Sequence, residues 1–152
     1  MQKKTTAVLA ALAVTSVASF QAFADTSPED AAKYRQAVMT SMGGHIGAAS
    51  MIARGLVEDD GHLVKHAEGL ANGADELDRL FQEGSNVGES EALPIIWEEP
   101  EAFAEAIAKA QEATAAFVAA AEGGDKEAIG AAFRNVGMSC RGCHDKFRVA
   151  DD

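Results

Sequence analysis

The sequence predicts an all-α fold, an antiparallel up-and-down four-helix bundle. Apolar residues recur at spacings of three and four residues along four stretches of helical length, which is the period of an amphipathic helix. No stretch shows the two-residue alternation of a half-buried strand that could compete with these patterns. The links between the stretches are mostly short, and short links favour antiparallel neighbours in a bundle.

Residues 1–24 have the composition of a secretory signal peptide. Lys3 and Lys4 form a basic start, an alanine-rich apolar run follows, and the small-residue sequence AFA ends at Ala24. The alternative is a retained membrane anchor, but the run is short for a bilayer span and no basic flank follows it. We therefore expect cleavage, no membrane insertion, and a single mature domain of residues 25–152 in the periplasm.

The charge of the chain is strongly acidic. The formal net charge is -11, and both lysines of the first 24 residues leave with that segment, so 11 basic and 24 acidic residues give the mature chain -13. Such a surface repels nucleic acid and anionic lipid and favours a basic partner or a neutral ligand. Solubility of a small exported protein explains the same acidity equally well.

The first two helices are expected before residue 82. Ser27 can cap the first helix, Pro28 suits its first position, and the helix should reach about Arg54. On or near one apolar stripe of this helix lie Tyr34, Val38, Met42, Ile46, Ala49 and Ile52. The second helix should follow the EDDG sequence of residues 58–61, and its stripe comprises Leu63, Ala67, Leu70, Ala74, Leu77 and Phe81.

The last two helices follow a long connection, residues 82–99. Pro100 should begin the third helix, which should stop at Gly123 and Gly124 because glycine suits a helix C-terminus. Asp125 can cap the fourth helix. The apolar stripe of that helix comprises Ile129, Phe133, Val136, Cys140, Cys143 and Phe147, so both cysteines of the chain lie on the face toward the core.

The sequence SCRGCHDKFR, residues 139–148, holds Cys140, Cys143 and His144. Three chemistries compete for two thiols and an imidazole: a reducible disulfide, a zinc site, and covalent haem attachment. A thioredoxin-type pair needs a helix N-terminus next to a sheet, whereas these cysteines lie deep in a helix. Positions i, i+3 and i+4 share one side of a helix, so all three groups can reach one object inside the bundle.

A zinc site would need a fourth ligand from another helix. His45, His62 or His66 would have to supply it, since structural zinc takes four ligands. His62 and His66 do have i, i+4 spacing, but the acids around them favour a solvated face over a metal site.

The Cys-x-x-Cys-His spacing is the attachment pattern of c-type haem. The two thiols add across the two vinyl groups of the porphyrin, and the imidazole becomes an axial ligand of the iron. Export of the chain and the apolar position of the cysteines agree with this chemistry. The sequence thus predicts a bundle that encloses one haem c, covalently bound through Cys140 and Cys143, with His144 as the metal ligand.

The chain resembles cytochrome c′ in three places. These are PEDAAKYRQAVM near the mature start, ALPIIW before the third helix, and GMSCRGCHDKFR around the haem motif. The resemblance covers nearly the whole mature chain, and the late position of the motif is specific. It implies a haem between the helices, a homodimer, and a five-coordinate, high-spin iron that binds nitric oxide or carbon monoxide.

The resemblance also implies roles for further residues. Arg35 and Gln36 match residues that contact the haem propionates, although a solvated helix face is the alternative for both. Arg148 matches a basic residue beside the axial histidine, and a cation that complements the helix dipole is the alternative. Glu91 matches a position near the propionate side. Trp97 matches a tryptophan near the edge of the cofactor, or else anchors the loop over the core.

Met39 matches the position whose side chain lies over the open side of the iron. If Met39 only fills space, the iron is five-coordinate and a small gas displaces the side chain. If its sulfur binds, the protein is a low-spin, six-coordinate electron-transfer cytochrome that uses a basic redox partner. The KYRQ context favours the gas-binding form. No second base or nucleophile stands out, so the sequence predicts a binding protein and no enzyme.

Overall fold

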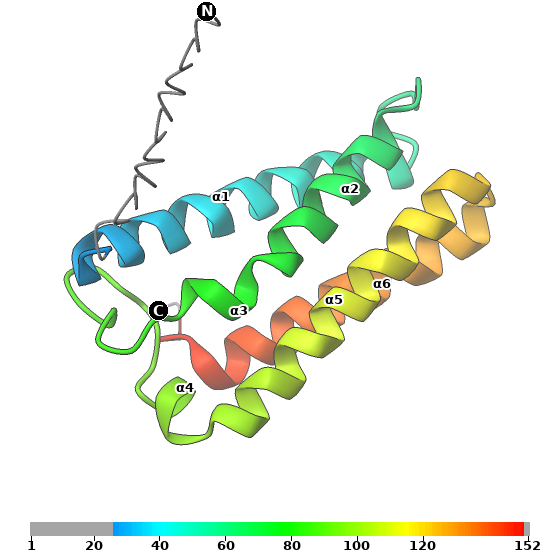
Figure 1. Cartoon of the computed structure of the whole chain (residues 1–152). Coiled ribbons are helices and arrows are strands. Elements are labelled where there is room, and N and C mark those ends of the chain that lie inside the picture. The colour runs from blue at the N-terminus through cyan, green and yellow to red at the C-terminus, as the bar shows by residue number, and fades with distance from the viewer. Residues whose placement is uncertain (1–25, 151–152) are drawn as a thin grey trace, which may run out of the picture.

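The computed structural model describes residues 26–150, so the predicted signal peptide lies outside the described residues. Four long helices form the body of the molecule, and two short ones lie between them (Figure 1). In chain order the helices are α1 (Pro28–Ala53), α2 (His62–Asp75), α3 (Leu77–Leu80), α4 (Ile95–Glu98), α5 (Pro100–Gly123) and α6 (Lys126–Phe147). The predicted all-α four-helix bundle is confirmed.

The starts of α1, α5 and α6 and the end of α5 are set by the residues that the sequence indicated. The hydroxyl of Ser27 accepts a hydrogen bond from the Asp30 amide at 3.1 Å, and Asp125 accepts one from the Ala128 amide at 2.8 Å. Pro28 and Pro100 occupy first positions, where a missing amide hydrogen costs nothing. Gly124 ends α5 with φ 71°, a left-handed conformation that favours glycine.

The second helix ends earlier than its apolar spacing predicted. It stops at Asp75, where the Glu76 amide bonds to the Gly73 carbonyl at 3.3 Å and tightens the last turn. The four residues of α3 continue the stripe, since Leu77 and Leu80 are buried. Tyr34, predicted on or near the apolar stripe of α1, is exposed, and its hydroxyl donates to the Glu76 carboxylate at 2.7 Å beside this break.

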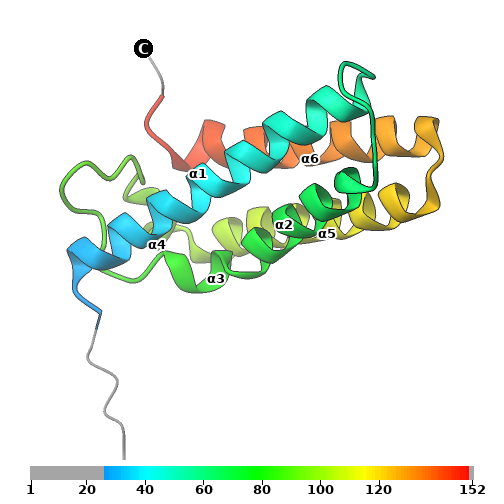
Figure 2. The same ribbon diagram turned by 90° about the horizontal axis from the view of Figure 1, so that it is seen from above.

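The long helices pack in the order α1, α2, α5, α6 around the bundle (Figure 2). The core between them is apolar, and its fully buried side chains include Leu70, Phe117 and Val136. The fourth pair, α6 with α1, is much less closely packed than the other three. This uneven packing leaves space between the first and last helices.

Two glycines bring α2 close to α1. A Cβ atom at Gly73 would lie 2.6 Å from Met42 Cγ, and one at Gly69 would lie 2.5 Å from the His45 ring. Neither distance is compatible with a real side chain. The absence of side chains at these two positions therefore seats Met42 and His45 of α1 against the backbone of α2.

The residues after α6 pair with the long connection before α5. Ala92 and Arg148 form an isolated antiparallel bridge, the Leu93 amide donates to the Phe147 carbonyl at 2.9 Å, and the Val149 amide donates to the Glu91 carbonyl at 2.8 Å. The connection is thereby fixed beside the end of α6. None of the helices within residues 26–150 has the length and apolar character needed to span a membrane.

Candidate haem site

A cavity of about 860 Å³ opens between α1, α6 and the long connection. Its volume lies within the range of about 300–1,000 Å³ that cofactor sites occupy. Eight of the nine residues that the sequence assigned to the haem site line this cavity: Arg35, Gln36, Met39, Glu91, Cys140, Cys143, His144 and Arg148. Residues from α1, the connection and α6, which are distant in the sequence, are thus brought together at one site.

Cys140 and Cys143 are free, half-buried thiols on the side of α6 that faces the cavity. Burial raises the pKa of both thiols, and the neighbouring Cys140 adds a smaller contribution to that of Cys143, which rises to about 11. A redox pair needs the opposite effect, because its reactive thiol has a lowered pKa. His144 follows on the same helix, is exposed, and also lines the cavity.

The zinc alternative lacks ligands. Within residues 26–150, no group of three or more histidine, cysteine, aspartate and glutamate side chains gathers in a way that could hold a metal ion. His62 contacts Asp60 and is exposed, as expected of a solvated face. The same expectation is wrong for His66, which is half-buried and contacts His45.

Arg35 is buried, so the alternative that placed it on a solvated helix face is wrong. Its guanidinium donates to the Leu80 carbonyl, to the Ser85 hydroxyl and carbonyl, and to the Ser90 hydroxyl at 2.8–3.1 Å. It also lies over the Phe81 ring at 5.0 Å. All of these acceptors are neutral. Burial lowers the pKa of Arg35, yet guanidinium stays charged in proteins, and no carboxylate within residues 26–150 forms an ion pair with it.

Gln36 and Met39 continue the α1 wall of the cavity. The Gln36 side-chain amide donates to the Glu89 carbonyl at 3.0 Å and remains exposed. Met39 is half-buried and packs against the core cluster. Because Met39 lies on α1 and His144 on α6, the two side chains belong to different walls of the same cavity.

Glu91 and Arg148 form an ion pair at the rim. Arg148 Nε lies 3.2 Å from Glu91 Oε2, and the Arg148 amide bonds to the His144 carbonyl at 3.1 Å. Arg148 therefore caps α6, one turn after His144. This ion pair links the end of α6 to the connection through side chains, next to the backbone bridge between Ala92 and Arg148.

The sequence placed three phenylalanines of this cavity on apolar stripes, namely Phe81 on the second helix, Phe103 on the third and Phe147 on the fourth, and predicted a core position for them. Phe103 meets the rings of Phe81 and Phe147 edge to face, with centroids 4.7 and 5.0 Å apart. All three line the cavity, together with Ile46 and Ile96. Their positions on the apolar stripes were visible in the sequence, but a stripe does not tell which core residues border a space.

Trp97 does not line the cavity. Its indole nitrogen donates to the Phe81 carbonyl at 3.1 Å, which supports the anchoring alternative over a contact with the cofactor.

The residues of the cavity fit haem c. The apolar aromatic walls suit a flat porphyrin, two thiols with i, i+3 spacing suit the two thioether bonds, and His144 can supply an axial nitrogen. The buried Arg35 guanidinium, with neutral partners alone, suits an anionic propionate at the same end.

Comparison with known proteins agrees with this fit. The cytochrome c′ family model matches residues 30–148. The cytochrome c′ of Rhodospirillum rubrum is 34% identical over 144 residues, which cover 94% of this chain and 95% of that protein. Two solved structures of variants of the Alcaligenes xylosoxidans cytochrome c prime, a nitric oxide complex and a carbon monoxide complex, each have a TM-score of 0.76 and 33% identity. Both matches cover 82% of this chain and 98% of that chain.

A helical bundle, a Cys-x-x-Cys-His cavity wall and a family match over residues 30–148 converge on one conclusion. The chain belongs to the cytochrome c′ family of c-type haem proteins.

Proposed function

We propose that this protein is a periplasmic haem c protein that binds a small neutral gas, nitric oxide or carbon monoxide, on the side of the iron that faces Met39. One observation carries the proposal. Met39 and His144 line the same cavity from two different helices, so a haem held on α6 would lie next to the α1 wall that carries Met39. The proposal includes a homodimer, and a basic redox partner remains compatible with the acidic surface.

When bound, the haem would supply an iron that can take the His144 imidazole and a small gas as ligands. Cys140 and Cys143 would fix the porphyrin to α6. Arg35 and Gln36 would face the propionates, and Glu91 with Arg148 would close the rim beside His144. The apolar wall around Met39 excludes charged ligands and admits neutral ones, because burial of an uncompensated charge is costly. We assign a binding role and no catalytic residue.

A visible spectrum of the reduced protein, recorded before and after carbon monoxide, tests the proposal. A high-spin spectrum that changes promptly on addition of the gas is the expected result. Sharp low-spin bands that ignore the gas would contradict it and would favour Met39 as the second axial ligand of an electron carrier. In that case Met39→Ala should restore gas binding. A mass without the added haem would overturn both forms of the function.

A further inference from the structure

A second site of interest lies at the α1–α2 interface, outside the residues that line the haem cavity. His45 of α1 and His66 of α2 are both half-buried, and their Nδ1 atoms are 3.1 Å apart. The ring centroids are 5.3 Å apart, and the ring planes are tilted by 58°. The two imidazoles therefore meet through their nitrogens and are not stacked.

The distance between the two Nδ1 atoms matches the distance between two nitrogen ligands of one transition-metal ion. Histidine nitrogens bind Zn²⁺ at about 2.0–2.1 Å. Two such nitrogens are roughly 3.3 Å apart at a tetrahedral ion and about 2.9 Å apart at a square-planar one, by the same bond length. The observed 3.1 Å lies between these values. The two helices thus already hold the donor atoms at the distance that one ion requires.

The backbone of α2 makes room for one of these rings. Gly69 lies one turn after His66 on α2, and a Cβ atom there would come within 2.5 Å of His45 Cε1 and Nε2. Any larger residue would push the His45 ring away from its place. Packing therefore orients the ring before an ion arrives, which lowers the ordering cost of binding.

The protonation chemistry is simple. A hydrogen bond between two Nδ1 atoms needs one protonated and one bare nitrogen. Metal binding needs both nitrogens bare, so the donor ring moves its proton to Nε2 and remains neutral. No net proton release is required. The connection before α2 carries Glu58, Asp59 and Asp60, whose charges favour the approach of a cation.

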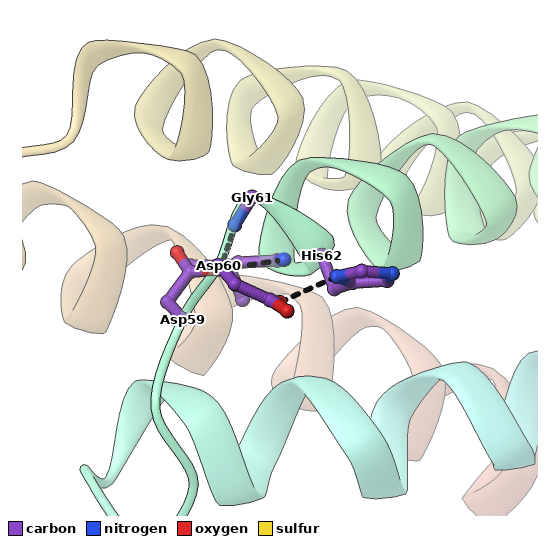
Figure 3. A network of polar contacts seen from close by, with 5 residues as sticks. Asp59, Asp60, Gly61 and His62 are labelled. Atoms are coloured by element: carbon purple, nitrogen blue, oxygen red, sulfur yellow. Dashed lines mark hydrogen bonds and ion pairs between the residues drawn. The ribbon is translucent and has the colours of Figure 1, made fainter.

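His62 offers a matched comparison one turn earlier on α2. Figure 3 shows its ring beside Asp60, and the Asp59 carboxylate accepts from the Gly61 and Leu63 amides, so both carboxylates serve the start of the helix. His62 Nδ1 lies 2.5 Å from Asp60 Oδ1 and is thereby engaged away from the His45–His66 pair.

We propose that His45 and His66 form a binding site for one divalent transition-metal ion, Zn²⁺ or Cu²⁺, that bridges α1 and α2, with water completing the coordination. The site is separate from the haem iron and does not depend on the proposed gas binding. His45 precedes Ile46, which lines the haem cavity from α1. The ion would therefore link α1 to α2 next to the α1 wall of that cavity.

Calorimetric titration of the haem-loaded, tag-free protein with ZnCl₂ tests the site, since haem occupies the cysteines and His144. One ion per chain is expected to bind. Loss of an outer-sphere partner already weakens metal sites by about 10–100-fold, so His45→Gln and His66→Gln should each weaken binding at least about tenfold. His62→Gln should leave binding unchanged. With Cu²⁺, the electron paramagnetic resonance spectrum should show two nitrogen ligands.

Three results would overturn the proposal. They are the absence of binding up to millimolar Zn²⁺, a His45→Gln variant that binds as tightly as the parent, and loss of binding in His62→Gln alone. Helical circular dichroism of each variant establishes that the bundle is intact. The copper spectrum of the parent protein provides a second test that needs no variant, because fewer than two nitrogen ligands would contradict a bridging pair.

Discussion

Arg35 shows how a single buried cation can organise an irregular segment. Its guanidinium joins α1 to the end of α3 and to the first half of the connection, through Leu80, Ser85 and Ser90. These acceptors have no other charged donor among the contacts described for residues 26–150. The cation therefore has two tasks, since it shapes the connection and also faces the cavity.

Replacement of Arg35 by glutamine should lower the free energy of unfolding by at least about 2 kcal/mol, because hydrogen bonds from a charged donor are lost and buried acceptors are left unpaired. Urea unfolding followed by circular dichroism measures the change. Lys33→Gln, on an exposed position of the same helix, should stay within about 0.5 kcal/mol of the parent. Equal stability of the Arg35 variant and the parent would contradict the structural role.

The thiol of Cys143 should react slowly with alkylating reagents in haem-free protein. Its pKa is raised to about 11, mainly by burial, so at pH 8 the thiolate fraction is roughly a hundredfold below that of an ordinary cysteine. Iodoacetamide should therefore modify the folded chain far more slowly than the urea-unfolded chain. Because the folded pKa is the higher one, the thiol stabilises the fold below pH 9, and this contribution is lost as the pH rises through 11. Alkylation at equal rates in both states would contradict the burial effect.

For single residues, the sequence predicted the chemical role of the haem-attachment motif better than it predicted which side chains are buried and what they contact. The spacing of Cys140, Cys143 and His144 is enough to indicate haem attachment. Burial of Arg35 was not predictable from the stripe of α1, since the acceptors that satisfy it come from residues 80–90, a segment without periodicity. His45 and His66 are 21 residues apart, and only the packing of α1 on α2 reveals that they meet.

The glycines of α1 and α2 have opposite consequences for helix stability. Gly73→Ala should destabilise the protein by about 1–3 kcal/mol, because the new methyl group meets Met42 Cγ at 2.6 Å and overpacks the interface. Gly47→Ala, on an open position of α1 with nothing within 4 Å, should stabilise it by about 0.5–1 kcal/mol. Thermal unfolding of the two variants measures the difference. If both changes had the same sign, the close approach of α2 to α1 would be in doubt.

The cap of α6 can be tested by a conservative pair. Asp125→Ala should cost about 0.5–2 kcal/mol because the Ala128 amide loses its acceptor. Asp125→Asn should be nearly neutral, since asparagine caps equally well. Chemical unfolding of both variants distinguishes a capping bond from a general effect of charge, which would affect both alike.

Helix starts were predictable because they depend on local chemistry, as at Ser27, Pro100 and Asp125. The end of α2 was not predictable. The apolar spacing continues unchanged from Ala74 to Leu77 and Phe81, so the stripe gives no sign of the break at Glu76. The break is accompanied by a polar cluster of Tyr34, Glu76 and Arg79, in which one residue comes from another helix.

The net charge of the whole molecule should determine how fast charged reagents and partners approach it. Residues 126–148 carry five cations and two acids, but three of those cations lie in ion pairs, Arg141 with Asp145, Lys146 with Glu99 and Arg148 with Glu91. The formal charge of -13 for residues 25–152 (11 minus 24) therefore dominates at long range. At low salt this field attracts cations and repels anions.

Reduction of the haem by a small cationic reagent should slow as ionic strength rises from 0.01 to 0.1 M, since the Debye length falls from about 30 to about 10 Å. An anionic reagent should react faster over the same range. Stopped-flow spectroscopy measures both rates. If salt affected the two reagents alike, steering by the acidic surface would be excluded.

The fold was easier to predict from the sequence than the helix ends or the burial of single residues, because four amphipathic stretches with short links leave few other arrangements. The loose packing of α1 against α6 was not visible in either helix alone. It depends on how both helices pack against α2 and α5 and on the aromatic residues that border the gap, among them Phe103 and Phe147.

The order of the cavity walls along the chain also sets a sequence of events. α1, the connection and α5 all precede α6, so a chain that emerges N-terminus first delivers three sides of the haem site before the helix that carries Cys140 and Cys143. The cofactor is therefore attached to the last wall to arrive. During assembly, α1, the connection and α5 would therefore be available before α6, and the haem site would be completed only when α6 joins them.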